Sequence, residues 1–189
     1  MNTAINKRTN PFRKLITSVT ALAAAATMLV VSAPAANAAT VPAVPGITAN
    51  AHVQNIGWQG TRSANGLSGV TVGTTGQSLR LEAVNIGLVN MPSTQGGIRV
   101  NAHVANVGWQ GYRSAVAGRT VTAGTTGQGN AIEAVQIQLY GPISKYFDVE
   151  YQLHLEGIGW QGYRRNGATA GTTGQGRRSE ALNIRLRRK

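Results

Sequence analysis

Residues 52–60 read HVQNIGWQG, and the same stretch returns as HVANVGWQG at 103–111 and as HLEGIGWQG at 154–162. Successive tryptophans are 51 residues apart both times, and every tryptophan and histidine of the chain lies in this stretch. Self-similarity at a constant period is typical of a chain built from repeated structural units. The stretch therefore divides the chain into three copies of one unit.

Two further blocks follow the tryptophan stretch in every copy. The first reads GTTGQ, at 73–77, 124–128 and 171–175, and the second begins with Glu-Ala, at 82–88, 133–139 and 180–186. The copies extend over about 46–89, 97–140 and 148–187. The third copy is four residues shorter between Trp160 and its GTTGQ. This difference predicts a loop there, because loops tolerate deletions.

The closing block of each copy alternates with a period of two, as a half-buried strand does. In the first copy Val84 and Ile86 share the inward face, and Asn85 lies on the other. The opening block reads as a second, continuous strand, on which Trp109 shares a face with Val107. The Gly-, Ser- and Thr-rich residues between the two strands predict a short hairpin, with GTTGQ as a turn.

A copy of about 42 residues is too small to bury the apolar face of its own strands. Three copies can close around an axis and remove the exposed edges of their sheets. The sequence therefore predicts an all-β fold, a single domain at 46–189 preceded by a linker at 39–45. Its three tandem repeats close with pseudo-threefold symmetry, and the fold is β-trefoil-like or β-prism-like. An open solenoid is the remaining alternative.

The first 38 residues have the pattern of a secretory signal peptide. Four cations precede an apolar run over 15–31, Pro34 interrupts it, and Ala36-Asn37-Ala38 offers a cleavage site. A permanent membrane anchor is the alternative, because the run is nearly long enough to span a bilayer. The cleavage site favours export, with no integral membrane segment left in the mature chain.

The remaining chain is basic and contains no cysteine. Beyond residue 38 it has 14 Lys and Arg against six acids, a net charge of +8. The lack of disulfides in an exported chain indicates a bacterial export route. Cations concentrate in the third copy, and a basic face of this kind attracts anionic polymers. The predicted polyanion face consists of Arg177, Arg178, Arg185, Arg187, Arg188 and Lys189.

The three blocks together resemble the ChW family, the clostridial hydrophobic repeats with an invariant tryptophan. HV-x-N-[IV]-G-W-Q-G, GTTGQ and EA-[VL]-x-I-x-L carry the resemblance, which covers essentially all of the chain after residue 38. The resemblance implies a secreted or cell-surface bacterial protein of the kind proposed to act in adhesion or polysaccharide contact.

Three kinds of recurring residue are interpreted as structural. Each tryptophan is expected in the core, with an exposed sugar-stacking platform as the alternative. Each glutamate is expected on the inward face, accepting hydrogen bonds from turn amides, the indole N–H or a nearby arginine. Each histidine is expected to be packed, with a three-histidine metal site as the alternative. The residues are Trp58, Trp109, Trp160, Glu82, Glu133, Glu180, His52, His103 and His154.

The polar residues around the WQG motif are the predicted ligand contacts. Planar amide and guanidinium groups suit recognition of hydroxyl or carboxylate groups. The predicted contacts are Gln59, Arg62, Gln110, Arg113, Gln161 and Arg164. Three related, shallow sites would bind weakly one by one and more strongly together.

The expected function is that of a secreted, non-enzymatic binding or adhesion protein that contacts cell-wall or environmental polysaccharide. The alternative is an envelope polyanion-binding protein that acts through its basic face without a sugar pocket. A glycosidase-like carboxylate pair is disfavoured, since symmetric copies present one environment three times and catalysis needs two. No metal or cofactor is expected, and nucleic-acid binding is not expected because interleaved aromatic residues are missing.

Overall fold

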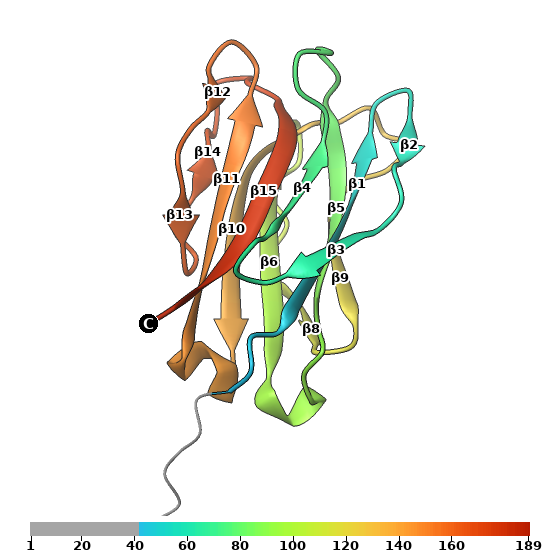
Figure 1. The fold of residues 1–189 in the computed structure, drawn as a ribbon. Coiled ribbons are helices and arrows are strands. Elements are labelled where there is room, and N and C mark those ends of the chain that lie inside the picture. Colours follow the sequence, from blue (N-terminus) through green and yellow to red (C-terminus); the bar gives the residue numbers. More distant parts are fainter. Residues whose placement is uncertain (1–41) are drawn as a thin grey trace, which may run out of the picture. The chain divides into compact units, whose positions relative to one another are not determined.

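The computed structural model describes residues 42–189, and the predicted signal peptide lies outside these residues. They form an all-β fold of three antiparallel sheets, which confirms the predicted class and the three repeats. Each sheet is built on the two long strands of one copy. Figure 1 shows these strands running along the molecule, with the tryptophan hairpins toward one end and the connections between copies at the other.

Each sheet has five strands, one of which comes from another copy. The first comprises β1 (Gly46–Val53), β2 (Gly57–Trp58), β3 (Arg62–Asn65), β5 (Leu81–Val89) and β9 (Thr120–Gly124). The second comprises β6 (Gly97–Val104), β7 (Gly108–Trp109), β8 (Arg113–Val116), β10 (Ile132–Tyr140) and β14 (Ala170–Gly171). The third comprises β11 (Phe147–Leu155), β12 (Gly159–Trp160), β13 (Arg164–Arg165), β15 (Ser179–Arg188) and β4 (Val70–Gly73).

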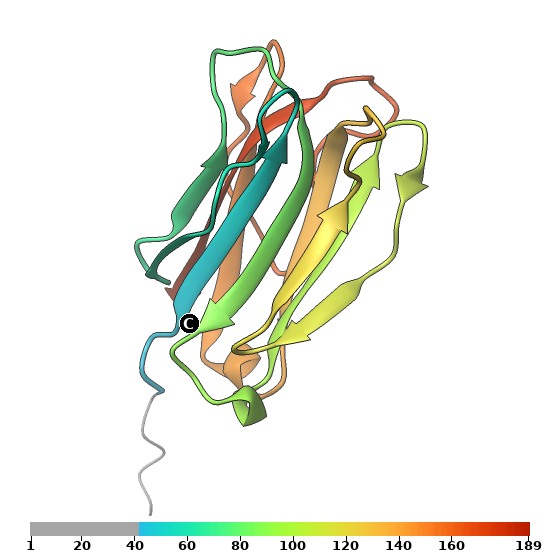
Figure 2. The ribbon, with the colours of Figure 1, turned by 90° about the vertical axis from the view of Figure 1, so that its right-hand side faces the viewer.

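The borrowed strands close the three sheets into a ring. Strand β9 of the second copy pairs with β5 of the first, and β14 of the third copy pairs with β10 of the second. The ring closes where β4 of the first copy pairs with β15 of the third. Three separate sheets, and no closed barrel among the described residues, match the prism-like alternative. Figure 2 shows β1 beside β5 from the side.

The long strands form the core because their inward positions are apolar in all three copies. Val84, Ile86 and Leu88 are fully buried, as the alternation of the closing block predicts. The third copy carries the bulkier Tyr151 on β11, and its hydroxyl donates a hydrogen bond to the carbonyl oxygen of Ala168. Burial raises the pKa of Tyr151 to about 12, so this phenol stays protonated and can donate.

The short segments also follow the sequence pattern. In each GTTGQ block the first glycine ends a strand and a bend follows, as predicted. The connections between copies contain the short 3-10 helices η1 (Ser93–Gln95) and η2 (Pro142–Lys145). The shorter third copy has two-residue strands β13 and β14, where the second copy has four and five residues. No helix among residues 42–189 is long and apolar enough to cross a membrane.

Candidate functional site

Each sheet carries one tryptophan beside one histidine on its outer face. Strand register places Trp58 opposite His52, and the same pairing recurs in the other two copies. The ring centroids are 5.4, 5.3 and 5.4 Å apart, with the rings close to perpendicular. This edge-to-face contact gives each indole a defined orientation.

The tryptophans are exposed, so the predicted burial is wrong. Their exposed fractions are 43% for Trp58, 39% for Trp109 and 40% for Trp160. The opening block is not one strand: the chain turns back after β1, β6 and β11, and each tryptophan follows that turn on a two-residue strand beside its long strand. In the first two copies Asn55 and Asn106 have positive φ angles of 62° and 65° within this turn. Each tryptophan therefore lies opposite its histidine on a strand at the edge of its sheet, and not on a central strand that is covered on both faces.

A β-bulge turns each glutamate toward the histidine of its own copy. His52 pairs with Ala83 and Val53 pairs with Leu81, which leaves Glu82 as the extra residue. The same bulge occurs at Glu133 and Glu180. Bulges redirect side chains. Each histidine lies between two inward-facing residues of its strand and so faces outward, and the carboxylate contacts it on that outward side. The predicted inward orientation of the glutamates is therefore wrong.

Each buried carboxylate lies within ion-pair distance of a histidine. The Nδ1–Oε2 distances are 2.9 Å in the first copy, 3.1 Å in the second and 3.2 Å in the third. Despite these short distances, the contacts do not have the angles of a hydrogen bond. The glutamates are only 4–6% exposed. The predicted arginine partner occurs in the first and third copies, where it is Arg80 and Arg178, and not an arginine that follows the WQG motif.

Two of the three carboxylates have a second partner. Arg80 donates from Nε to Glu82 at 2.8 Å, and Arg178 donates to Glu180 at 3.4 Å. The second copy has Ala131 at the corresponding position, two residues before Glu133. Glu133 therefore has His103 as its only ion-pair partner among the described residues.

Replacing Glu82 by alanine should destabilise the fold more than replacing Glu133. Glu82→Ala leaves both His52 and Arg80 without their carboxylate partner. We expect the free energy of unfolding to fall by about 2–3 kcal/mol. Glu133→Ala leaves only His103, and the loss should be smaller. Urea unfolding of the two variants measures the difference. Glu156→Ala is the control, because this carboxylate is 43% exposed and should change stability by less than about 1 kcal/mol. Equal losses at Glu82 and Glu133 would contradict the role of Arg80.

The histidines do not converge on one metal site. Each lies on a different sheet and faces its own glutamate, so the threefold arrangement separates the three rings. Among residues 42–189 no group of three or more potential metal ligands occurs.

The amide side chains beside the tryptophan were not among the residues predicted for the site. In the first copy Asn50 and Asn85 face each other across β1 and β5, and Asn85 donates to the Thr122 hydroxyl at 2.8 Å. Together with Trp58 these asparagines line a hollow of about 250 Å³. The signal in the sequence was the outward position of Asn85 and the placement of Asn50 two residues before His52.

The predicted contact glutamines bond to the backbone of the fold. The side-chain oxygens of Gln59, Gln110 and Gln161 accept hydrogen bonds of 2.8–2.9 Å from the first glycine of the GTTGQ block in their own copy. That glycine lies on the strand that joins the neighbouring sheet. Ligand binding by these glutamines stays a prediction, and the observed bonds hold the WQG stretch against the borrowed strand.

The predicted contact arginines lie at the surface. Arg62, Arg113 and Arg164 are exposed on β3, β8 and β13. Arg62 donates to the carbonyl oxygen of Thr71 at 3.0 Å. Their role in ligand binding also stays a prediction.

The predicted basic face is partly neutralised by acids of the third copy. Arg185 pairs with Glu150 at 2.9 Å, and Arg178 pairs with Glu156 at 2.6 Å. Arg177, Arg187 and Arg188 are exposed, although the Arg188 guanidinium lies over the ring of Phe147. The unneutralised charge is therefore concentrated on these three arginines.

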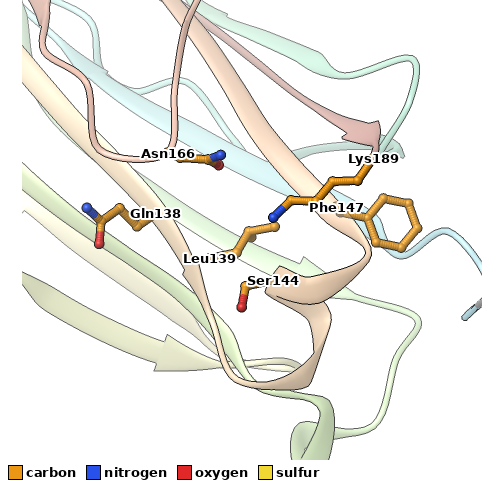
Figure 3. A pocket seen from close by; sticks show the side chains of 6 residues that line it. All are labelled: Gln138, Leu139, Ser144, Phe147, Asn166 and Lys189. Atoms are coloured by element: carbon orange, nitrogen blue, oxygen red, sulfur yellow. The ribbon is translucent and has the colours of Figure 1, made fainter.

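Lys189 borders a second hollow, away from the tryptophans. The hollow measures about 300 Å³ and lies beside η2, where Figure 3 shows the Lys189 side chain extending into it. Its amine is 3.5 Å from the carboxylate of Asp148. The lining residues are Gln138, Leu139, Ser144, Phe147, Asn166 and Lys189.

No curated protein and no solved structure matches this chain. A sequence model of the family described as Clostridial hydrophobic W matches it three times, at residues 52–90, 103–141 and 154–188. These matches cover more than half of the chain and coincide with the three copies of the Trp–His–Glu arrangement. The chain therefore belongs to the Clostridial hydrophobic W, or ChW, family, of which it carries three repeats.

Proposed function

We propose that this repeat protein is a secreted, non-enzymatic binding protein that contacts cell-wall or environmental polysaccharide through the outer faces of its sheets. The observation that carries the proposal is the exposure of all three tryptophans, which are 39–43% accessible. An exposed indole offers a large apolar face to the C–H side of a sugar ring, and adjacent amides can bond its hydroxyls. The signal-peptide pattern of residues 1–38 supports export.

The surroundings of the indoles support a binding role over a catalytic one. Each indole packs edge-to-face against a histidine that itself lies against a buried glutamate, so the indole has a defined orientation before a ligand binds. The three glutamates are all buried, and each lies against the histidine of its own copy. A general acid and a general base require different environments, which three similar carboxylates do not offer.

Replacing all three tryptophans by alanine should strongly weaken binding to polysaccharide while leaving the fold intact. Truncating an aromatic binding residue commonly costs 2 kcal/mol or more, so we expect at least a tenfold loss of affinity. Sedimentation with insoluble cellulose, chitin and purified bacterial cell wall measures binding, and thermal unfolding followed by circular dichroism checks the fold. Undiminished binding to every polymer by the folded triple variant would contradict the proposal.

The alternative, binding of an anionic envelope polymer by charge, is supported by the exposed arginines of the third copy. The same sedimentation assay separates the two functions. Stacking on neutral sugar should persist at 0.5 M salt, whereas charge-driven binding should fade as screening increases. Replacing both Arg187 and Arg188 by glutamine should weaken only the charge-driven component, because both side chains are exposed.

A further inference from the structure

The three outer faces of the protein differ in chemistry, although their tryptophans are equivalent. We propose that the face of the first copy, formed by Trp58, Asn50 and Asn85, is the principal sugar site. It takes one uncharged, hydroxyl-rich ring, whereas the other two faces bind such a ring weakly or not at all. This inference rests on the proposed function and assigns it to one copy.

The first difference is a tyrosine that the first copy lacks. Three residues after the tryptophan, the second and third copies have Tyr112 and Tyr163, while the first has Thr61. The guanidinium of Arg185 lies 3.7 Å from the ring centre of Tyr163, and the Tyr163 hydroxyl donates to Asn183 at 2.8 Å. In the third copy the face of that ring and the adjacent amide are therefore already occupied. Arg99 lies over Tyr112 in the second copy at 5.0 Å.

The second difference is how many hydrogen bonds the central amide side chain of the closing strand already makes within the protein. In the third copy Asn183 accepts from Tyr163 and donates to Thr71, so both ends of its amide are engaged. In the second copy Gln136 accepts from Asn101 and donates to Thr169. In the first copy Asn85 donates to Thr122, and its oxygen has no hydrogen bond among the described residues. A free carbonyl oxygen next to a hollow can accept a sugar hydroxyl.

Asn50 adds an unsatisfied acceptor to the same face. Its side-chain oxygen is buried and has no hydrogen-bond partner among residues 42–189. A buried acceptor without a partner is unfavourable, and a bound donor can relieve this cost. Asn101 has the same unsatisfied oxygen in the second copy, but there the neighbouring Gln136 is engaged at both ends.

The third difference is charge. Two residues along the strands from Asn50 and Asn85, the first copy has the pair Thr48 and Gly87, which are small and neutral. The second copy has Arg99 bonded to Gln138, and the third has Glu150 paired with Arg185. The first face therefore favours an uncharged ligand. Its hollow of about 250 Å³ lies below the usual volume of a site for a drug-sized molecule, which suits a single sugar ring.

Variants with one tryptophan each test the assignment. One keeps only Trp58, with Trp109→Phe and Trp160→Phe, and the matched variants keep only Trp109 or only Trp160. The probes are cellotetraose, chitotetraose and mannotetraose, with indole fluorescence as the readout. We expect a saturable fluorescence change with the wild type and with the variant that keeps Trp58. The other two variants should bind at least tenfold more weakly.

Asn85→Ala in the wild type tests the amide independently of the indole. It should reduce affinity at least fivefold without changing the melting temperature by more than a few degrees, whereas the matched Asn183→Ala should leave affinity within twofold. Titration calorimetry with the wild type should give one sugar per chain. Three sugars per chain, or equal binding by the three single-tryptophan variants, would overturn the assignment and leave the proposed function standing. Failure of the wild type to bind any polymer or probe would overturn both.

Discussion

Removing the third repeat, residues 145–189, should unfold the two repeats that remain. The truncation removes the third sheet except for β4 of the first copy, which loses its only ladder partner β15, and it removes β14 from the edge of the second sheet, where it pairs with β10. It also removes one of the three apolar faces that meet in the core, including Phe147, Leu153 and Ile184. In the two-copy fragment, strand edges would be exposed and one face of the core would be uncovered. The apolar area that remains buried is then too small to offset the conformational entropy that the chain loses on folding.

Circular dichroism and thermal unfolding of the fragment measure this effect. The fragment should lose its β signal and show no cooperative transition. Adding residues 145–189 as a separate peptide is the control, because it supplies β14 and β15 again, and it should restore part of the β signal. A two-copy fragment that melts cooperatively by itself would show that the copies stack openly and that the closure at β4 and β15 is dispensable.

Gly124→Ala should be among the most destabilising single substitutions in the chain. Gly124 ends β9 with a positive φ of 103°, and a Cβ atom there would lie 2.4 Å from the carbonyl oxygen of Glu82. Side chains rarely adopt such a φ, and the cost is about 1–2 kcal/mol before any collision. Relief of the collision requires β9 to move away from β5, its partner in the neighbouring copy. We therefore expect a total loss of more than about 3 kcal/mol.

Gly118→Ala is the matched control for this substitution. Gly118 has a φ of 82°, but a Cβ atom there would meet nothing within 4 Å. Its replacement should cost only the conformational strain, about 1 kcal/mol. Chemical denaturation of both variants measures the two losses. Similar values would show that the contact between β9 and β5 is loose enough to accept a side chain.

Much of the fold could be predicted from local pattern alone. The period of the HVxN[IV]GWQG, GTTGQ and EA-[VL] blocks determined the number of copies, and the alternation of Val84, Ile86 and Leu88 determined the inward face of the closing strand. Both signals depend on neighbouring residues, because side chains on a strand alternate with a period of two. The turn at GTTGQ also followed from composition.

The site was harder to predict, because a turn and a β-bulge place its side chains where a regular strand would not. The turn after β1 exposed Trp58, and the bulge at Glu82 brought that carboxylate to His52. The turn folds Trp58 back to the edge of the sheet, opposite His52, and the bulge shifts the alternation by one residue and so reverses the face on which the Glu82 side chain lies. The difference between the three faces also depends on positions far apart in the chain, such as Thr61 and Gly87.

Local sequence pattern was enough to predict three copies, an all-β fold and the apolar residues of the closing strands that face the core, such as Val84, Ile86 and Leu88. The tertiary structure alone decided that β4, β9 and β14 each join the sheet of another copy. Near-identical copies carry the same local signals, so these signals cannot specify which sheet a short strand joins. That choice depends on non-local pairing and on the closure of the ring, through which all three sheets cover one core.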